Sequence, residues 1–172
     1  MRDKKGFSMM EMVVYIAILA IVSILVVSSM LKMMSVYNGY RVSRSINIAG
    51  STAMERITRE IRLADNVVST DSIFETHPGI LKLDTIDPVS EVATTIEFFA
   101  SSTQLMIKEG ANPADVLTPP AIELTNLVFR EVATSTNLNS KAIKVEVELK
   151  GERGNYEKTT KFYNTVILRR SY

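Results

Sequence analysis

Glu11 is the residue of this 172-residue chain that is best placed to do chemistry. It stands immediately before an apolar run, Met12–Leu31, that contains no charged residue. A carboxylate at the head of such a run costs free energy, because an ion at the centre of a bilayer costs about 2.5–3.5 kcal/mol and less near the edge. Two interpretations stay open. Glu11 pairs with a cation, or it reaches the headgroup layer and favours the positive end of the helix dipole.

Other groups with chemical potential are sparse. The chain has no cysteine, which excludes disulfides, thiolate metal sites and a cysteine nucleophile. His77 is the single histidine, and a zinc site is not expected without a second histidine or a cysteine. Glu146 and Glu148 alternate with lysines and are typical of solubilising charges. Asp84 and Asp87 lack the glycine-centred pattern of a calcium loop. We therefore predict no catalytic residue, no cofactor, no metal and no enzyme.

The charge balance also limits the partners. The formal net charge is +1, and bases and acids are nearly balanced beyond residue 32. A domain that binds nucleic acid through phosphate contacts carries a basic excess. We therefore expect no nucleic-acid partner.

The apolar run is long enough to cross a membrane as a helix, since about 20 apolar residues span a bilayer. Arg2, Lys4 and Lys5 precede it and Lys32 follows it. The positive-inside rule then predicts a cytoplasmic N-terminus and an extracytoplasmic C-terminal part.

Three interpretations of this segment compete. It is a plain single-pass anchor, a cleaved signal peptide, or a segment in which Glu11 has a role. A signal peptide is disfavoured because the run exceeds the usual 7–15 apolar residues and no A-x-A sequence follows, although residues 27–29 are small.

Residues 6–11, Gly-Phe-Ser-Met-Met-Glu, resemble the cleavage and methylation motif of type IV prepilins and pseudopilins. That motif is a basic leader ending in glycine, then Phe, Thr or Ser, two apolar residues, Glu and an apolar helix. Two features depart from the usual pattern. Met9 and Met10 replace Leu and Ile, and no proline interrupts the span, which puts local melting of this helix within a filament in doubt.

The resemblance implies that prepilin peptidase cleaves between Gly6 and Phe7 and that Phe7 becomes N-methylated. It also implies that Glu11 meets the N-terminal amine of a neighbouring subunit during assembly. The physics agrees, because two poorly solvated opposite charges gain most by pairing.

Two weaker resemblances point to a J-type minor pseudopilin or a related minor pilin. They are the Arg59–Ala64 stretch and the C-terminal Ile167–Tyr172. We therefore expect a structural subunit of a type IV pilus or a type II secretion pseudopilus. Its expected partners are prepilin peptidase, other pilin subunits, an inner-membrane assembly platform and the lipid bilayer. Its expected place is the inner membrane and then the filament. The alternative is a membrane-anchored extracytoplasmic binding or sensor domain.

An amphipathic helix is expected to continue beyond the membrane. One apolar stripe recurs every three or four residues. It comprises Ile46, Ala49 or Gly50, Ala53, Ile57, Ile61 and Ala64. The opposite, polar face comprises Glu55, Arg56, Arg59, Glu60 and Arg62, with Glu55–Arg59 and Arg56–Glu60 spaced to pair. Asn38–Gly39 is a candidate kink, and the helix is expected to end near residue 66.

Beyond residue 67 the apolar pattern has period two, which predicts strands. A hairpin turn is expected at Ser101–Ser102, a bulge within Ile122–Val132, and a clear strand at Ala142–Lys150. A turn at residues 151–155 leads to the last strand.

The predicted fold class is thus α+β, a long N-terminal α-helix packed on a C-terminal antiparallel β-sheet domain, pilin-like in kind. The predicted segments are a leader at 1–6, a transmembrane helix at 7–31, its amphipathic continuation at 32–66 and a β-rich domain at 67–172.

Overall fold

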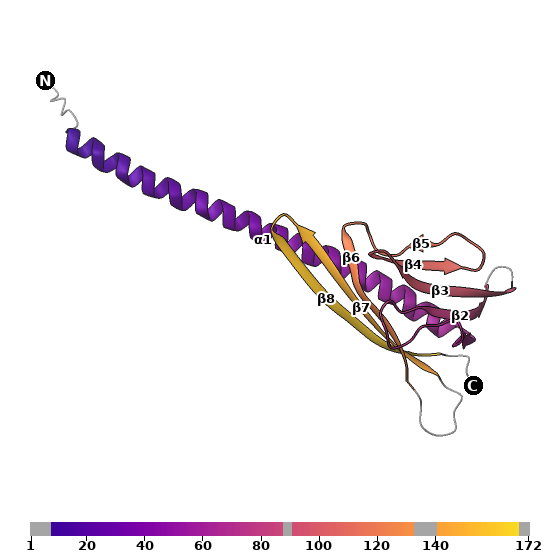
Figure 1. The fold of residues 1–172 in the computed structure, drawn as a ribbon. Helices are drawn as coiled ribbons and strands as arrows, with labels where there is room; N and C mark the ends of the chain where they lie inside the picture. Colours follow the sequence, from indigo (N-terminus) through magenta and orange to yellow (C-terminus); the bar gives the residue numbers. More distant parts are fainter. Residues whose placement is uncertain (1–7, 88–90, 133–140, 169–172) are drawn as a thin grey trace.

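A computed structural model of the chain describes residues 8–87, 91–132 and 141–168. One helix, α1 (Met9–Leu63), runs without interruption for 55 residues. Its N-terminal half projects away from the rest of the molecule, and its C-terminal half packs against the strands (Figure 1). The predicted α+β class is confirmed.

Two expectations for α1 are wrong. The helix passes through Asn38 and Gly39 without a break, because Gly39 is buried beneath the Tyr156 ring and serves close packing. The helix also ends at Leu63, three residues before the predicted boundary. Ala64 already has extended backbone, and Asn66–Val67 forms strand β1, whose ladder hydrogen bonds replace those of a further helical turn.

The predicted apolar stripe of α1 is confirmed as its contact with the β-domain. Ile46, Ala53, Ile57 and Ile61 have no exposed surface. They join one hydrophobic core with the inward side chains of the strands. The helix makes its most extensive contacts with β8 and then with β7.

The strands form two antiparallel sheets, a division that the alternation in the sequence does not reveal. The first sheet has the order β1-β2-β3-β4-β5. Its strands are β1 (Asn66–Val67), β2 (Leu81–Ile86), β3 (Ala93–Ser101), β4 (Gln104–Glu109) and β5 (Asp115–Val116). The predicted hairpin between β3 and β4 is confirmed, with Ser101 paired to Gln104 and Ser102 at a φ of 54°.

The second sheet has the order β6-β7-β8, with β6 (Ile122–Val132), β7 (Ala142–Arg153) and β8 (Tyr156–Ile167). The predicted bulge in β6 is confirmed, since the register shifts between Leu124 and Asn126. The inward residues predicted for β7, such as Val145 and Leu149, are fully buried. The turn between β7 and β8 is shorter than expected, because Arg153 already pairs with Tyr156 and only Gly154 and Asn155 connect the strands.

Candidate functional site

Glu11 lies in the first turn of α1, where another described residue contacts its carboxylate. The Tyr15 hydroxyl, one turn further on, donates a hydrogen bond of 3.0 Å to Glu11 Oε1. Ser8 holds the N-cap position without a side-chain cap, so the first-turn carboxylate is the acidic group near the free N–H groups of this helix end. The carboxylate is therefore held by a hydrogen bond from its own helix.

The predicted cleavage and methylation residues, Gly6 and Phe7, lie outside the described residues. The described chain begins at Ser8 in extended backbone. Met9 and Met10 follow it and are 88% and 76% exposed. Ser8, Met9 and Met10, which follow the predicted cleavage site, are thus not packed on the β-domain.

The N-terminal half of α1, which we call the bare half, is exposed and packs against no other described element. Every large apolar side chain from Met9 to Val36 is exposed, and none of the most apolar part of the helix is buried within the chain. By length and composition this helix can cross a membrane, a property that a signal sequence near an N-terminus also has. Apolar surface of this extent requires lipid or other helices around it.

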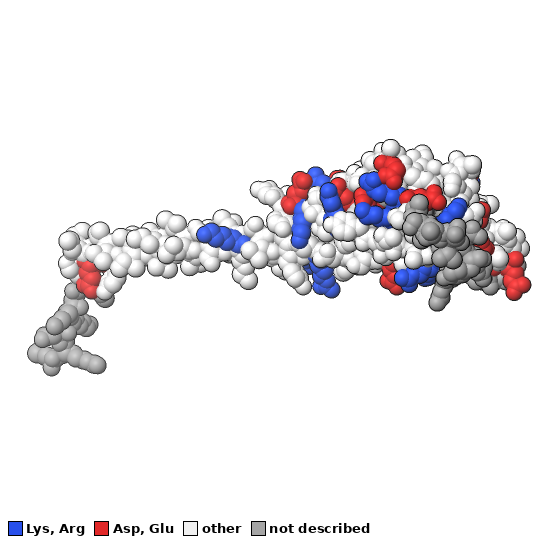
Figure 2. All heavy atoms as spheres, turned by 90° about the horizontal axis from the view of Figure 1, so that it is seen from below, with Lys and Arg blue, Asp and Glu red and all other residues white. Residues whose placement is uncertain are grey.

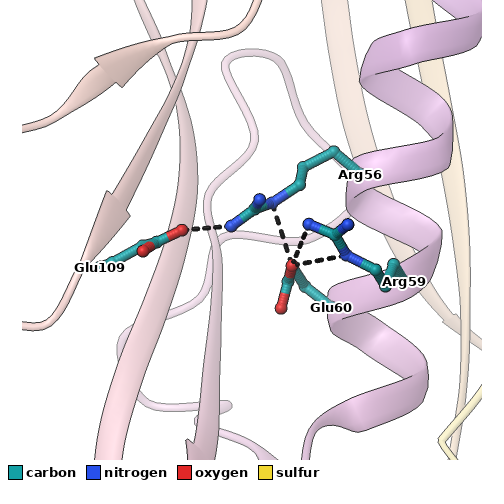
Figure 3. A network of polar contacts seen from close by, with 4 residues as sticks. All are labelled: Arg56, Arg59, Glu60 and Glu109. Atoms are coloured by element: carbon teal, nitrogen blue, oxygen red, sulfur yellow. Dashed lines mark hydrogen bonds and ion pairs between the residues drawn. The ribbon is translucent and has the colours of Figure 1, made fainter. Parts of the chain in front are cut away.

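A second polar cluster joins α1 to the first sheet (Figure 3). Arg56 Nε lies 2.9 Å from Glu60 Oε1, as the i, i+4 spacing predicts. Arg59 also donates to Glu60 Oε1, at 3.2 Å from both Nε and Nη2. Arg56 reaches across to Glu109 on β4 through its Nη2.

Glu60 belongs to the predicted polar face, yet it is buried. Its side chain is only 9% exposed, because the first sheet lies against this side of the helix. Arg59 contacts Glu60 and no ion pair with Glu55 is present among the described residues. The spacing i, i+4 identified Arg56–Glu60, whereas nothing in the sequence marks Glu109 as their partner.

Several other charged groups form ion pairs on the sheets. Lys144 lies 2.7 Å from Glu146, and its hydrogen bond is the main reason that the pKa of Glu146 is lowered. Lys82 lies 2.6 Å from Asp71, and that hydrogen bond lowers the pKa of Asp71. These pairs sit on exposed or half-buried surface, consistent with solubilising charges rather than an acid–base pair.

His77 is held by the backbone. Its Nδ1 accepts a hydrogen bond of 3.0 Å from the Leu127 amide of β6, so it fastens a loop to the second sheet, a role that its lone position in the sequence does not reveal. Within the described ranges, no group of three or more His, Cys, Asp or Glu residues is arranged to hold a metal ion.

Comparison with known proteins gives one match. The prokaryotic N-terminal methylation motif matches residues 1–27, the segment that contains the predicted cleavage site, Glu11 and most of the apolar run. No curated protein and no solved structure matches the chain.

The matched segment ends within the bare half of α1, so the motif and the exposed helix form one continuous unit. This N-terminal match supports a resemblance to type IV prepilins and pseudopilins.

Proposed function

We propose that this protein is a minor pilin or pseudopilin, a structural subunit of a type IV pilus or a type II secretion pseudopilus. Its work is done by packing and not by catalysis. Before assembly, the subunit is anchored in the inner membrane with its β-domain on the extracytoplasmic side. An assembly platform then transfers it into a filament whose core is made of N-terminal helices.

One observation carries the proposal. The N-terminal methylation motif at residues 1–27 includes the start of a 55-residue helix, and no described part of the chain covers the first half of that helix. A helix of this kind satisfies its backbone in lipid and offers its side chains to other helices. The β-domain packs only on the second half of the helix, so the first half is available for such contacts (Figure 1).

The proposal assigns roles to three residues. Prepilin peptidase cleaves between Gly6 and Phe7, Phe7 is N-methylated, and Glu11 pairs with the N-terminal amine of a neighbouring subunit. The hydrogen bond from Tyr15 supports the last role, because it holds the Glu11 carboxylate at the start of α1, and a carboxylate can accept from more than one donor.

The intact mass and the N-terminal peptide of the protein isolated from its own membranes test the processing step. We expect a chain that begins at N-methylated Phe7. The variant Gly6→Leu should keep its leader, whereas Met10→Leu, a volume-conserving change beyond the bond, should be processed normally.

A wild-type chain that begins at Met1, or full processing of Gly6→Leu, would favour the other candidate function, a membrane-anchored binding or sensor domain. The same bare helix is the observation that keeps this alternative open, since a plain anchor needs the same length.

A further inference from the structure

The turn between β7 and β8 lies at the end of the β-domain that faces the apolar half of α1 (Figure 1). A Cβ placed on Gly154 would lie 3.9 Å from Asn38 Nδ2, and the Tyr156 ring packs on Gly39. Asn38 is seven residues beyond Leu31, or about 10 Å along a helix axis. When Met12–Leu31 spans a membrane, this end of the domain is therefore the part nearest the lipid.

Five bases surround this end, and we call them the basic collar. They are Lys32, Arg41, Arg44, Arg153 and Lys158. The first four are exposed and Lys158 is half-buried. Blue side chains are visible along the bare helix and where the domain begins (Figure 2).

No member of the basic collar forms an ion pair with a described residue. The Arg41 guanidinium lies 5.0 Å from the centre of the Tyr37 ring, and Lys158 donates to Ser43 Oγ at 3.0 Å. Three acids lie nearby: Glu157 is paired with Lys150 at 3.1 Å, and Glu123 and Glu152 are also close enough to Lys150 to raise its pKa. The collar thus keeps a positive excess.

Many bases further along the domain are neutralised. Arg56, Lys82, Arg130, Lys144 and Lys161 each lie within ion-pair distance of a glutamate or aspartate. Among the described bases that form no ion pair, five belong to the basic collar, whereas Arg62, Lys108 and Lys141 lie elsewhere on the domain.

The same region carries interfacial aromatic residues. Tyr37 and Tyr40 are 54% and 65% exposed on the short stretch of α1 between Lys32 and the domain. Exposed tyrosines beside a membrane span are typical of the headgroup layer, where the ring is apolar and the hydroxyl is solvated. Lysine and arginine near an anionic surface are attracted within roughly one Debye length, about 8 Å at physiological salt.

We infer that the membrane-proximal end of the β-domain docks on anionic phospholipid headgroups, with Tyr37 and Tyr40 in the interfacial layer and the basic collar against the lipid phosphates. The inference rests on the membrane-anchored state of the proposed function. It predicts that the domain is held against the membrane surface until the subunit is drawn into a filament.

Nanodiscs test this docking with the full-length chain. Because the protein has no cysteine, Asn155→Cys supplies a unique site for a fluorophore at the β7–β8 turn. We expect quenching by headgroup-labelled lipid to be about two-fold or more stronger in discs with roughly one-third phosphatidylglycerol than in phosphatidylcholine discs. Added salt of about 0.5 M should remove the difference.

A label at Asn112→Cys serves as the position control. Asn112 is exposed and lies beside Arg59 and Leu63, near the far end of α1, so its quenching should not depend on lipid charge.

Two charge-matched triple variants complete the test. Arg41→Gln/Arg44→Gln/Arg153→Gln should abolish the effect of lipid charge, whereas Arg62→Gln/Lys108→Gln/Lys141→Gln, outside the collar, should preserve it. Equal quenching in both lipids, or an equal loss in both triple variants, overturns the inference and points to another subunit as the partner of the collar. A wild-type chain that does not enter the discs overturns the membrane-anchored state itself.

Discussion

At the scale of single residues, Glu60 shows how tertiary contacts change the environment of a helix position. The spacing along α1 groups it with the polar face, yet its side chain is almost fully buried beside the first sheet. It is satisfied there by Arg56 and Arg59, and Arg56 extends the contact to Glu109. The cluster joins α1 to the first sheet because Arg56 contacts both Glu60 on the helix and Glu109 on β4. The buried carboxylate is stabilised only while its guanidinium partners are present.

We therefore expect Glu60→Ala to lower the free energy of unfolding by about 2 kcal/mol, because the half-buried Arg56 and the exposed Arg59 both lose a charged acceptor. Chemical denaturation of the detergent-solubilised chain would measure it. Glu55→Ala, an exposed change on the same helix, should cost less than about 0.5 kcal/mol. Equal small losses in both variants would mean that the cluster contributes no stability.

At the scale of elements, α1 has two environments along one continuous helix. Its first half is exposed on all sides, and its second half buries one stripe against β7 and β8. Gly39 and Gly50 stand where the helix meets the rings of Tyr156 and Phe162, and a Cβ at Gly50 would come within 2.3 Å of the Phe162 ring. These glycines permit close approach of β8 and do not interrupt the helix.

The stripe predicts a position-dependent stability. Ile57→Ala should lower the free energy of unfolding by about 2–4 kcal/mol, because it leaves a cavity at a side chain with no exposed surface. Thermal or chemical denaturation would measure the change. Ile48→Ala removes the same atoms from a side chain that is 57% exposed and is the matched control, with an expected cost below about 0.5 kcal/mol. Similar losses at both positions would contradict the packing of α1 on the second sheet.

At the scale of the whole molecule, the β-domain and the projecting half of α1 are two distinct parts. The β-domain is a closed body around one core, and the projecting helix is a long apolar surface that the chain itself does not cover (Figure 1). The methylation motif stands at the free end of that helix. Charge at Glu11 is therefore expected to act between molecules.

Glu11→Gln should be cleaved and inserted normally but should enter filaments about ten-fold less well. The change keeps the size of the side chain and removes the charge that favours an ammonium partner, and a ten-fold loss corresponds to about 1.4 kcal/mol. Immunoblotting of sheared filament and membrane fractions would measure it.

Tyr15→Phe is the control for this variant, because it removes the hydrogen bond within the chain and keeps the carboxylate. It should assemble nearly as well as the wild type. Normal assembly of Glu11→Gln would count against the pairing role, and an equal defect in Tyr15→Phe would assign the effect to the helix end instead.

The sequence by itself determined the features that depend on local order and periodicity. Residues 6–11 identified the methylation motif, the uncharged run predicted a helix able to span a membrane, and period-two alternation located β7 with its buried Val145 and Leu149. The bulge in β6 was also readable, since one slip in alternation requires one extra residue. Such patterns depend only on residues close together in the sequence, so they can be recognised without knowledge of the fold.

The tertiary structure alone decided what depends on contacts between distant segments. It divided the strands into two sheets, buried Glu60 against a sheet that carries Glu109, and placed Arg153 beside Arg41 and Lys158 beside Ser43. It also turned Gly39 from a candidate kink into a packing position for Tyr156. The physical reason is that burial and the local charge balance arise from side chains far apart in the sequence, 53 residues for Arg56 and Glu109 and 115 for Ser43 and Lys158, whose meeting is fixed only by the packing of α1 on the two sheets.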